Sequence, residues 1–300
     1  GRGGKVQVQD KDIWIHGVSF SQAHAPDSLL PKFHTPVPEA VNIAMLHTSL
    51  NGAPGHDPYA PCSVSDLSAL GFDYWALGHV HKRQIHSQSP WIVMPGIPQG
   101  RDIGEAGPKS ATLLSIDDSG VQVQEIPTSA VEFRAVTCDI TGLQTEDELR
   151  HKLRSDLLAQ ASDLASDAAI LRLSIVGHSD LAWALRRDQD RWQETLHEMA
   201  RGFGTLWLEK LVFEVTPPDI AVTATNPGAT GELQRIMQDI LTEDSFVAQA
   251  EQELTEMLAL LPPDRRADLA PDAETARALA QDLAEQAVQD MIALMKGVAP

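Results

Sequence analysis

This sequence has few cysteines, few basic residues and no long apolar run. Cys62 and Cys138 are the two cysteines among 300 residues, which excludes a disulfide framework and is typical of a reducing compartment. We interpret both as small buried side chains. No stretch of about 18 apolar residues is present, and the start lacks the layout of a secretory signal. The sequence therefore predicts a soluble, cytoplasmic protein.

Positive charge is scarce. The chain has 23 Lys and Arg against 42 Asp and Glu, a net charge of −19, which excludes a protein that wraps nucleic acid by its own charge alone. Residues 219–300 contain 15 acidic and 5 basic residues, a net charge of −10, so about half of the excess lies in this C-terminal part. Such a segment would contact a basic partner protein or simply keep the chain in solution, and both alternatives stay open.

The sequence also lacks the oxygen ligands that a histidine metal centre usually needs. No Asp-x-His and no Gly-Asp pair occurs, and none of the three Asn precedes a His. The histidines themselves are spaced for a metal, because His79 and His81 follow an apolar run and lie 32 and 34 residues after His47. Imidazole suits borderline divalent metals. Since the chain also begins Gly-Arg-Gly-Gly without Met, we expect a fragment that carries part of a metal site.

The first region, residues 1–130, shows the pattern of an α/β layer. Ser63 and Asp66 form a capping-box pattern that predicts a short helix. A strand, a helix and a second strand in succession predict a parallel pair, whose carboxyl ends open toward one site. His47 and His79 both lie at such ends. Apolar runs bounded by Gly, Pro and Ser predict the strands, at 41–46, 73–77, 91–94, 111–116 and 121–126.

The second region, residues 131–216, alternates strand and helix patterns and predicts a compact αβ domain. A linker rich in Pro and Gly follows at 217–230, and helical periodicity then continues over 231–300. The apolar stripes of this last region would pack within the chain or fit a groove on a partner. The αβ domain is predicted to have strands at 133–140, 169–176 and 206–215 and helices at 145–164 and 180–200.

Four motifs follow one another between residues 46 and 101. They are Leu46-His47-Thr48-Ser49-Leu50, Gly55-His56-Asp57-Pro58-Tyr59-Ala60-Pro61, Asp73-Tyr74-Trp75-Ala76-Leu77-Gly78-His79-Val80-His81 and Gly96-Ile97-Pro98-Gln99-Gly100-Arg101. A lone Gly-His-x-His is a weak signal, whereas the ordered set is specific. With these motifs the chain resembles the calcineurin-like metallophosphoesterases, and more narrowly the DNA repair exonucleases similar to the SbcD nuclease subunit.

The resemblance implies an α/β fold that consists of a partial metallophosphoesterase β-sandwich with flanking helices, an αβ capping domain and a C-terminal helical segment. That segment would bind an SMC-like ATPase. By position in the motifs, His47 and His79 would bind one metal and His81 the other. The remaining ligands of the family come from Asp-x-His, Gly-Asp and Gly-Asn-His motifs upstream of the first residue of this chain. Two divalent metal ions, most often manganese, are the expected cofactors.

The function that the resemblance implies is a metal-dependent DNA exonuclease subunit in double-strand break repair, with a homodimer as an option for the complete protein. His56 is a candidate catalytic residue near the scissile phosphate. Arg101 is a candidate contact to a DNA phosphate, and a buried arginine that braces its own loop is the equal alternative. Two other functions compete: a phosphomonoesterase or nucleotide phosphodiesterase on the same scaffold, and a non-catalytic interaction module with a degenerate site.

Overall fold

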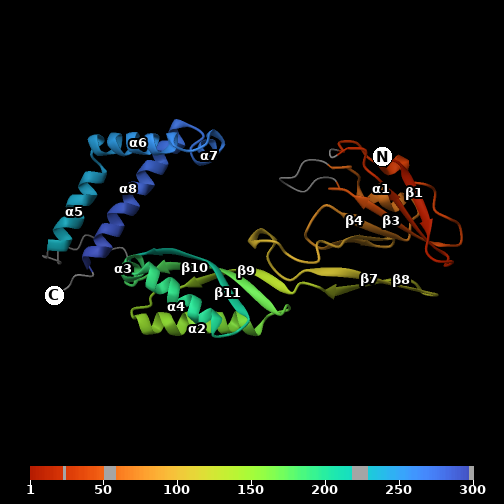
Figure 1. Ribbon diagram of the computed structural model, residues 1–300, viewed down its shortest axis with the longest axis horizontal. Helices are drawn as coiled ribbons and strands as arrows, with labels where there is room; N and C mark the ends of the chain where they lie inside the picture. The colour runs from red at the N-terminus through yellow and green to blue at the C-terminus, as the bar shows by residue number, and fades with distance from the viewer. Residues whose placement is uncertain (23–24, 51–58, 218–228, 297–300) are drawn as a thin grey trace. The chain divides into compact units, whose positions relative to one another are not determined.

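The computed structural model describes residues 1–22, 25–50, 59–217 and 229–296 (Figure 1). The chain divides into two compact units. The first comprises residues 1–136, 159–172 and 203–209, and the second comprises 137–158, 173–202 and 210–300. The borders of these two units differ from the predicted domain borders at 130 and 216. The domain borders stay a prediction.

A six-stranded sheet forms the body of the first unit (Figure 1). Its strand order is β1-β2-β3-β4-β6-β5, and β2, β3, β4 and β6 run parallel while β1 and β5 pair antiparallel at the two edges. A parallel arrangement places the carboxyl ends of the central strands at one edge of the sheet. The strands are β1 (Gly3–Gln7), β2 (Ile13–Val18), β3 (Val41–His47), β4 (Tyr74–Gly78), β5 (Gln84–Gln88) and β6 (Trp91–Met94).

Helix α1 (Val64–Ala69) connects β3 to β4. The predicted capping box is present, because the Asp66 amide donates to Ser63 Oγ at 3.0 Å and the Ser63 amide donates to the Asp66 carboxylate at 2.9 Å. This box satisfies two amides at the start of a helix that has only six residues. The crossover through α1 makes β3 and β4 parallel neighbours, as predicted, with His47 opposite Gly78 in the register.

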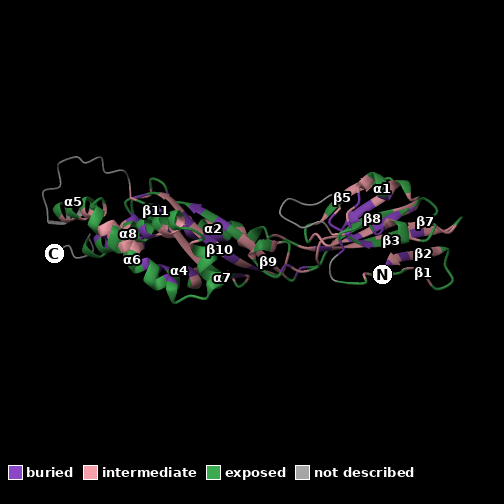
Figure 2. Ribbon diagram, turned by 90° about the horizontal axis from the view of Figure 1, so that it is seen from above, coloured by how far each residue is buried: buried purple, intermediate pink, exposed green. Residues whose placement is uncertain are grey.

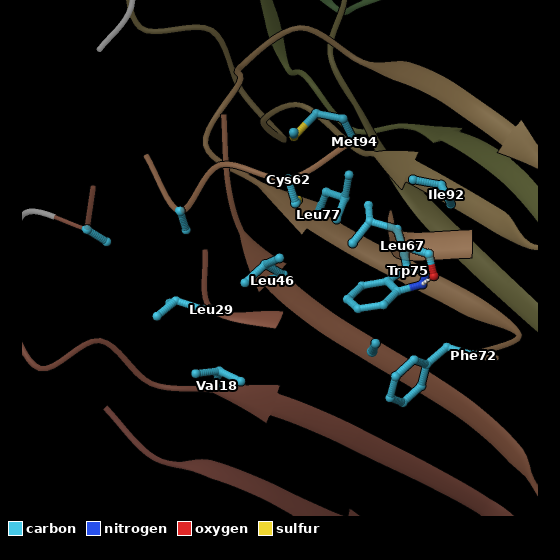
Figure 3. Packing of buried hydrophobic residues seen from close by; sticks show 13 residues of the cluster. Val18, Leu29, Leu46, Cys62, Leu67, Phe72, Trp75, Leu77, Ile92 and Met94 are labelled. Carbon is cyan, nitrogen blue, oxygen red and sulfur yellow. Dashed lines mark hydrogen bonds between the residues drawn. The ribbon is translucent and has the colours of Figure 1, made fainter. Parts of the chain in front are cut away.

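The core of this unit lies around Trp75, whose side chain is completely buried. Its indole N–H donates to the Leu67 carbonyl of α1 at 3.1 Å, and Phe72 packs edge-on against it (Figure 3). The bond satisfies the one polar atom of the indole, so the ring is buried without a desolvation penalty. Replacing such a side chain with Ala typically costs about 3–5 kcal/mol. Trp75 thereby fixes β4, and with it the position of the Gly-His-Val-His tetrad.

A two-stranded ribbon, β7 (Ser110–Asp117) and β8 (Gly120–Pro127), packs beside the six-stranded sheet. The Trp91 indole on β6 donates to the Val121 carbonyl on β8 at 2.9 Å. Arg83 donates to Thr112 on β7 at 2.6 Å and pairs with Glu125 on β8 at 3.2 Å. This ribbon is a second, smaller layer of strands.

A three-stranded sheet follows in the order β11-β10-β9, formed by β9 (Val131–Asp139), β10 (Ala168–His178) and β11 (Leu206–Thr216). Buried and less buried residues alternate along β10 (Figure 2), as expected for a strand with one covered face. Helix α2 (Glu146–Ser162) begins with the predicted capping box of Thr145 and Glu148.

The predicted helix at 180–200 is wrong as a single element. The chain forms α3 (Ala182–Arg187) and α4 (Gln189–Arg201), which are separated at Asp188. Asp188 has φ −111° and ψ 38°, outside the helical region. Asp is a poor residue for a helix interior because its side chain favours non-helical backbone, and apolar periodicity does not register that preference.

The C-terminal part of the second unit is helical, as predicted. Leu254 and Leu258 of α6 pack with Ala280 of α8 in a small core. Helix α6 ends at Ala259, Pro262 is the N-cap of α7, and Pro263 is the first residue of α7. No helix among the described residues is long and apolar enough to cross a membrane. The sheets and helices together confirm the predicted α/β fold class. The helices are α5 (Ala229–Leu241), α6 (Asp244–Ala259), α7 (Pro263–Leu269) and α8 (Ala273–Lys296).

Candidate metal centre

His47 and His79 come together at the carboxyl ends of β3 and β4, as the sequence predicts. His47 is the last residue of β3, and His79 directly follows β4. His47 Nε2 and His79 Nδ1 lie 3.1 Å apart, and the two rings are nearly perpendicular at 85°. At this distance one nitrogen donates a proton and the other accepts it. The two imidazole nitrogens thus face each other.

The backbone around this pair is constrained. His79 has a φ of 116°, a value that side-chain-bearing residues rarely adopt. Such a conformation costs about 1–3 kcal/mol and is retained where the surroundings impose it, often at a functional site. Gly78 lies close to His47, because a Cβ at this position would lie 3.2 Å from Nδ1 of His47. A side chain here would require the His47 ring to shift by a few tenths of an ångström.

Two aromatic side chains surround the histidine pair. The Tyr59 ring stacks on His79 with centroids 5.2 Å apart and planes 11° apart, and it meets His47 edge-on at 5.3 Å. Phe20 packs against both Tyr59 and His47, at 5.1 and 6.0 Å. These contacts restrict the rotation of both imidazoles. They also exclude water from part of the His47 ring.

His81 has a different set of partners. Its Nδ1 lies 2.5 Å from Glu105 Oε1, and Glu105 in turn binds Arg101 at 2.6 Å. The Glu105 side chain is only 12% exposed, whereas His81 and Arg101 are 44% and 69% exposed. Glu105 ends a short 3-10 turn, Ile103–Glu105, whose first residues are capped by Asp102. The carboxylate is therefore held between an imidazole and a guanidinium.

The pKa shifts of the site concern His47, whose neutral imidazole is favoured, and Glu105, whose ionised carboxylate is favoured. Partial burial is the main reason that the pKa of His47 is lowered, and the neighbouring His79 and His81 lower it further. The Arg101 guanidinium, followed by His81, lowers the pKa of Glu105 to about 2. A neutral imidazole retains a lone pair, and this is the form that binds metals.

Gly96 lies in a tight turn against the backbone of His81. Gly96 has a φ of 76°, and a Cβ on it would lie 2.8 Å from the His81 carbonyl oxygen and 2.9 Å from the Arg83 amide. The loop that follows is anchored by Gln99, whose side chain donates to the Val131 carbonyl at 2.7 Å and accepts from the Ala130 amide at 3.0 Å. The motif that ends at Arg101 therefore contacts the tetrad at His81, through the backbone near Gly96 and through Arg101 Nη2.

The histidine pair has the geometry of two ligands on one ion. Two nitrogens that bind one ion at about 2.1 Å, with an angle of about 90° to 110° between them, lie roughly 3.0–3.4 Å apart. The observed 3.1 Å falls in this interval. Among the described residues, no group of three or more His, Cys, Asp or Glu side chains is arranged to hold a metal. The two residues present thus fit an imidazole contribution to a divalent metal.

The remaining predicted site residues differ in what the structure says of them. His56, the candidate catalytic residue, lies outside the described residues. The Arg101 guanidinium binds Glu105 of its own loop through Nε and Nη2, in line with the alternative of an arginine that braces its loop. The side chain is 69% exposed, so the burial that this alternative included is wrong. Its contact to a DNA phosphate stays a prediction. Sequence reasoning missed Glu105, for which the spacing of four residues after Arg101 is the only signal.

Comparisons with known proteins find similarity to metallophosphoesterases. Residues 133–216 match the family model described as "Metallophosphoesterase YhaO, middle domain". The chain is also similar to the "Uncharacterized metallophosphoesterase YhaO" of Bacillus subtilis, with 34% identity over 128 residues. The comparisons support a metallophosphoesterase.

The match to the metallophosphoesterase of Bacillus subtilis is partial. It covers 42% of this chain and 31% of that relative, so the chain spans about a third of the length of the relative. The family match at 133–216 covers the region predicted as the αβ capping domain.

Proposed function

We propose that this chain contributes imidazole ligands to the metal centre of a phosphoesterase that hydrolyses phosphodiesters, with DNA as the substrate. The single observation that carries the proposal is the 3.1 Å approach of His47 Nε2 to His79 Nδ1 at the carboxyl ends of parallel strands. Similarity to a metallophosphoesterase supports hydrolysis of phosphate esters in general. The resemblance to DNA repair exonucleases supports DNA as the substrate.

Each residue of the site has a separate task in this proposal. His47 and His79 would hold one divalent ion and His81 a second, and manganese is the expected metal. When bound, such ions supply Lewis-acid chemistry at the phosphate and activate water. Tyr59 and Phe20 keep the first two imidazoles in place and exclude water from one side of them. Arg101 would reach a DNA phosphate, and His56 would act near the scissile bond.

The partner in this proposal is an SMC-like ATPase that binds the C-terminal helices. An open apolar groove of about 300 Å³ runs between α6 and α8 and is lined by Phe246, Leu254, Met257 and Leu283, among others. Met257 is 67% exposed and Leu283 is 46% exposed. An apolar helical groove of this kind suits an amphipathic helix of a partner. A homodimer of the complete protein belongs to the same proposal.

The test of the function is a hydrolysis assay with the full-length protein. Linear duplex DNA and bis(p-nitrophenyl) phosphate are incubated with Mn²⁺, for the wild type and for His47→Gln and His79→Gln. His151→Gln serves as the matched control, because His151 lies exposed on α2. We expect Mn²⁺-dependent degradation of DNA, lost by at least about a hundredfold in both site variants because the metal ligands are gone, and unchanged in the control.

Three other outcomes contradict parts of the proposal. Turnover of the small diester without DNA degradation assigns a nucleotide phosphodiesterase instead. Absence of any hydrolysis, with Mn²⁺ still bound, assigns a non-catalytic interaction module. Equal activity of the wild type and both histidine variants refutes the proposed metal centre.

A further inference from the structure

The contact between His81 and Glu105 determines which nitrogen of His81 carries the proton. Glu105 Oε1 lies 2.5 Å from His81 Nδ1, a distance at which a proton must lie between the two atoms. Both oxygens of the Glu105 carboxylate also accept hydrogen bonds from Arg101, so the carboxylate acts as an acceptor in this arrangement. His81 is therefore the donor, and its Nδ1 carries the proton.

Arg101 shares this arrangement without competing for the same proton. Its Nη2 lies 3.2 Å from His81 Nδ1, but a guanidinium only donates and cannot bond to a nitrogen that carries a proton. Its hydrogen bonds go to Glu105 instead. The backbone amide of Arg101 donates to Oε2 at 2.9 Å, Nε lies 3.2 Å from both oxygens, and Nη2 lies 2.6 Å from Oε1. Arg101 thus fixes both oxygens of the carboxylate.

We propose that Glu105 is a positioning residue, which locks His81 in the Nδ1–H tautomer so that the Nε2 lone pair is presented for a metal, while Arg101 holds the Glu105 carboxylate in place. The inference rests on the proposed function, because it needs His81 to be a ligand. A carboxylate on the far nitrogen fixes the ring orientation and makes the ligating nitrogen more basic. Loss of such a partner typically weakens metal affinity by about 10–100-fold.

The proposal gives the Arg101–Glu105 pair, of which only the arginine is exposed, a role that an ordinary surface ion pair does not have. Arg101 is 69% exposed, and an exposed pair contributes little to stability because water screens it. The same pair is nevertheless held by four contacts and joined to His81, and the carboxylate itself is only 12% exposed. Fixing the orientation of a ligand requires this rigidity, whereas folding does not.

The test measures the tautomer of His81 directly, by ¹⁵N NMR of the full-length protein labelled at histidine, at pH 8 and without metal. His81→Gln assigns the signal. In the wild type we expect the Nδ1–H form to dominate. In Glu105→Ala the ratio should shift toward the Nε2–H form. Glu105→Gln should largely restore the wild-type ratio, since the amide oxygen still accepts from Nδ1–H. Glu125→Ala removes a carboxylate of the same unit that pairs with Arg83, and should leave the ratio unchanged.

The second readout is binding of Mn²⁺, followed by the electron paramagnetic resonance signal of the free ion. We expect the dissociation constant to rise by about 10–100-fold in Glu105→Ala and to change little in Glu125→Ala. A wild type that already favours the Nε2–H form overturns the proposal, as does a ratio that Glu105→Ala leaves unchanged. A tautomer that responds as expected in a protein that hydrolyses no phosphodiester refutes the proposed function and leaves the positioning of His81 by Glu105 intact.

Discussion

Tyr59 stacks on His79, with the two ring planes 11° apart. An aromatic pair of this kind contributes about 0.5–1.5 kcal/mol beyond the area that it buries. In Tyr59→Leu we expect the free energy of unfolding to fall by about 1–2 kcal/mol in urea, and the affinity for Mn²⁺ to fall because His79 is less constrained. Tyr59→Phe retains the ring and should match the wild type within about 0.5 kcal/mol. Equal losses in both variants would show that the stacked ring has no such role.

The φ of 116° at His79 allows a prediction about stability that is separate from metal binding. His79→Ala and His79→Gly both remove the imidazole, so their difference reports the backbone alone. In an ordinary strand or helix, Gly is less stable than Ala by about 0.5–1 kcal/mol. At this φ the order should reverse, and His79→Gly should be the more stable of the two by about 1 kcal/mol in urea unfolding. A more stable Ala variant would mean that the backbone at His79 is not strained.

Gly96 supports His81 through a close backbone approach, and Gly107 provides a matched control. Both have positive φ, 76° and 82°, but a Cβ on Gly107 meets nothing within 4 Å. Gly96→Ala should therefore cost about 1–3 kcal/mol more than Gly107→Ala, because it adds a clash with the His81 carbonyl to the same backbone strain. It should also weaken Mn²⁺ binding by moving His81. The measurements are thermal unfolding and Mn²⁺ titration, and equal effects of the two variants would contradict the packing described here.

How much of this site the sequence predicts depends on the range of the interactions. The meeting of His47 and His79 was predictable, because apolar runs identify β3 and β4 and the capping box at Ser63 identifies the helix between them. Parallel strands then bring their carboxyl ends together. The contact of His81 with Glu105 was not predictable, since it depends on a 3-10 turn and on the rotation of one side chain.

The fold shows the same division. Strands with strong apolar periodicity, such as β10, were predicted within one or two residues. The break at Asp188 was missed because the apolar pattern continues through Leu185 and Trp192 on either side of it. The backbone preference of Asp188 alone determines that break, whereas apolar periodicity reflects a window of many residues.

Cys138 gives a prediction about pH and reactivity. It is completely buried, and burial raises the pKa of its thiol to about 12, with Asp156 adding to the effect. A raised pKa keeps the group in its unreactive thiol form, since the thiolate is the nucleophile. In the native protein at pH 8, Cys138 should not react with 5,5′-dithiobis(2-nitrobenzoate) within an hour, while the protein unfolded in urea should react within minutes. A native signal that Cys138→Ser abolishes would contradict the burial of this thiol.

The most direct measurement of the central claim is anomalous X-ray scattering at the manganese edge, from crystals of the full-length protein soaked in Mn²⁺. We predict an anomalous peak between His47 Nε2 and His79 Nδ1, on the order of 2 Å from each nitrogen. Manganese peaks found only elsewhere, with the two nitrogens still joined at 3.1 Å by their hydrogen bond, would contradict a metal centre at this edge of the sheet.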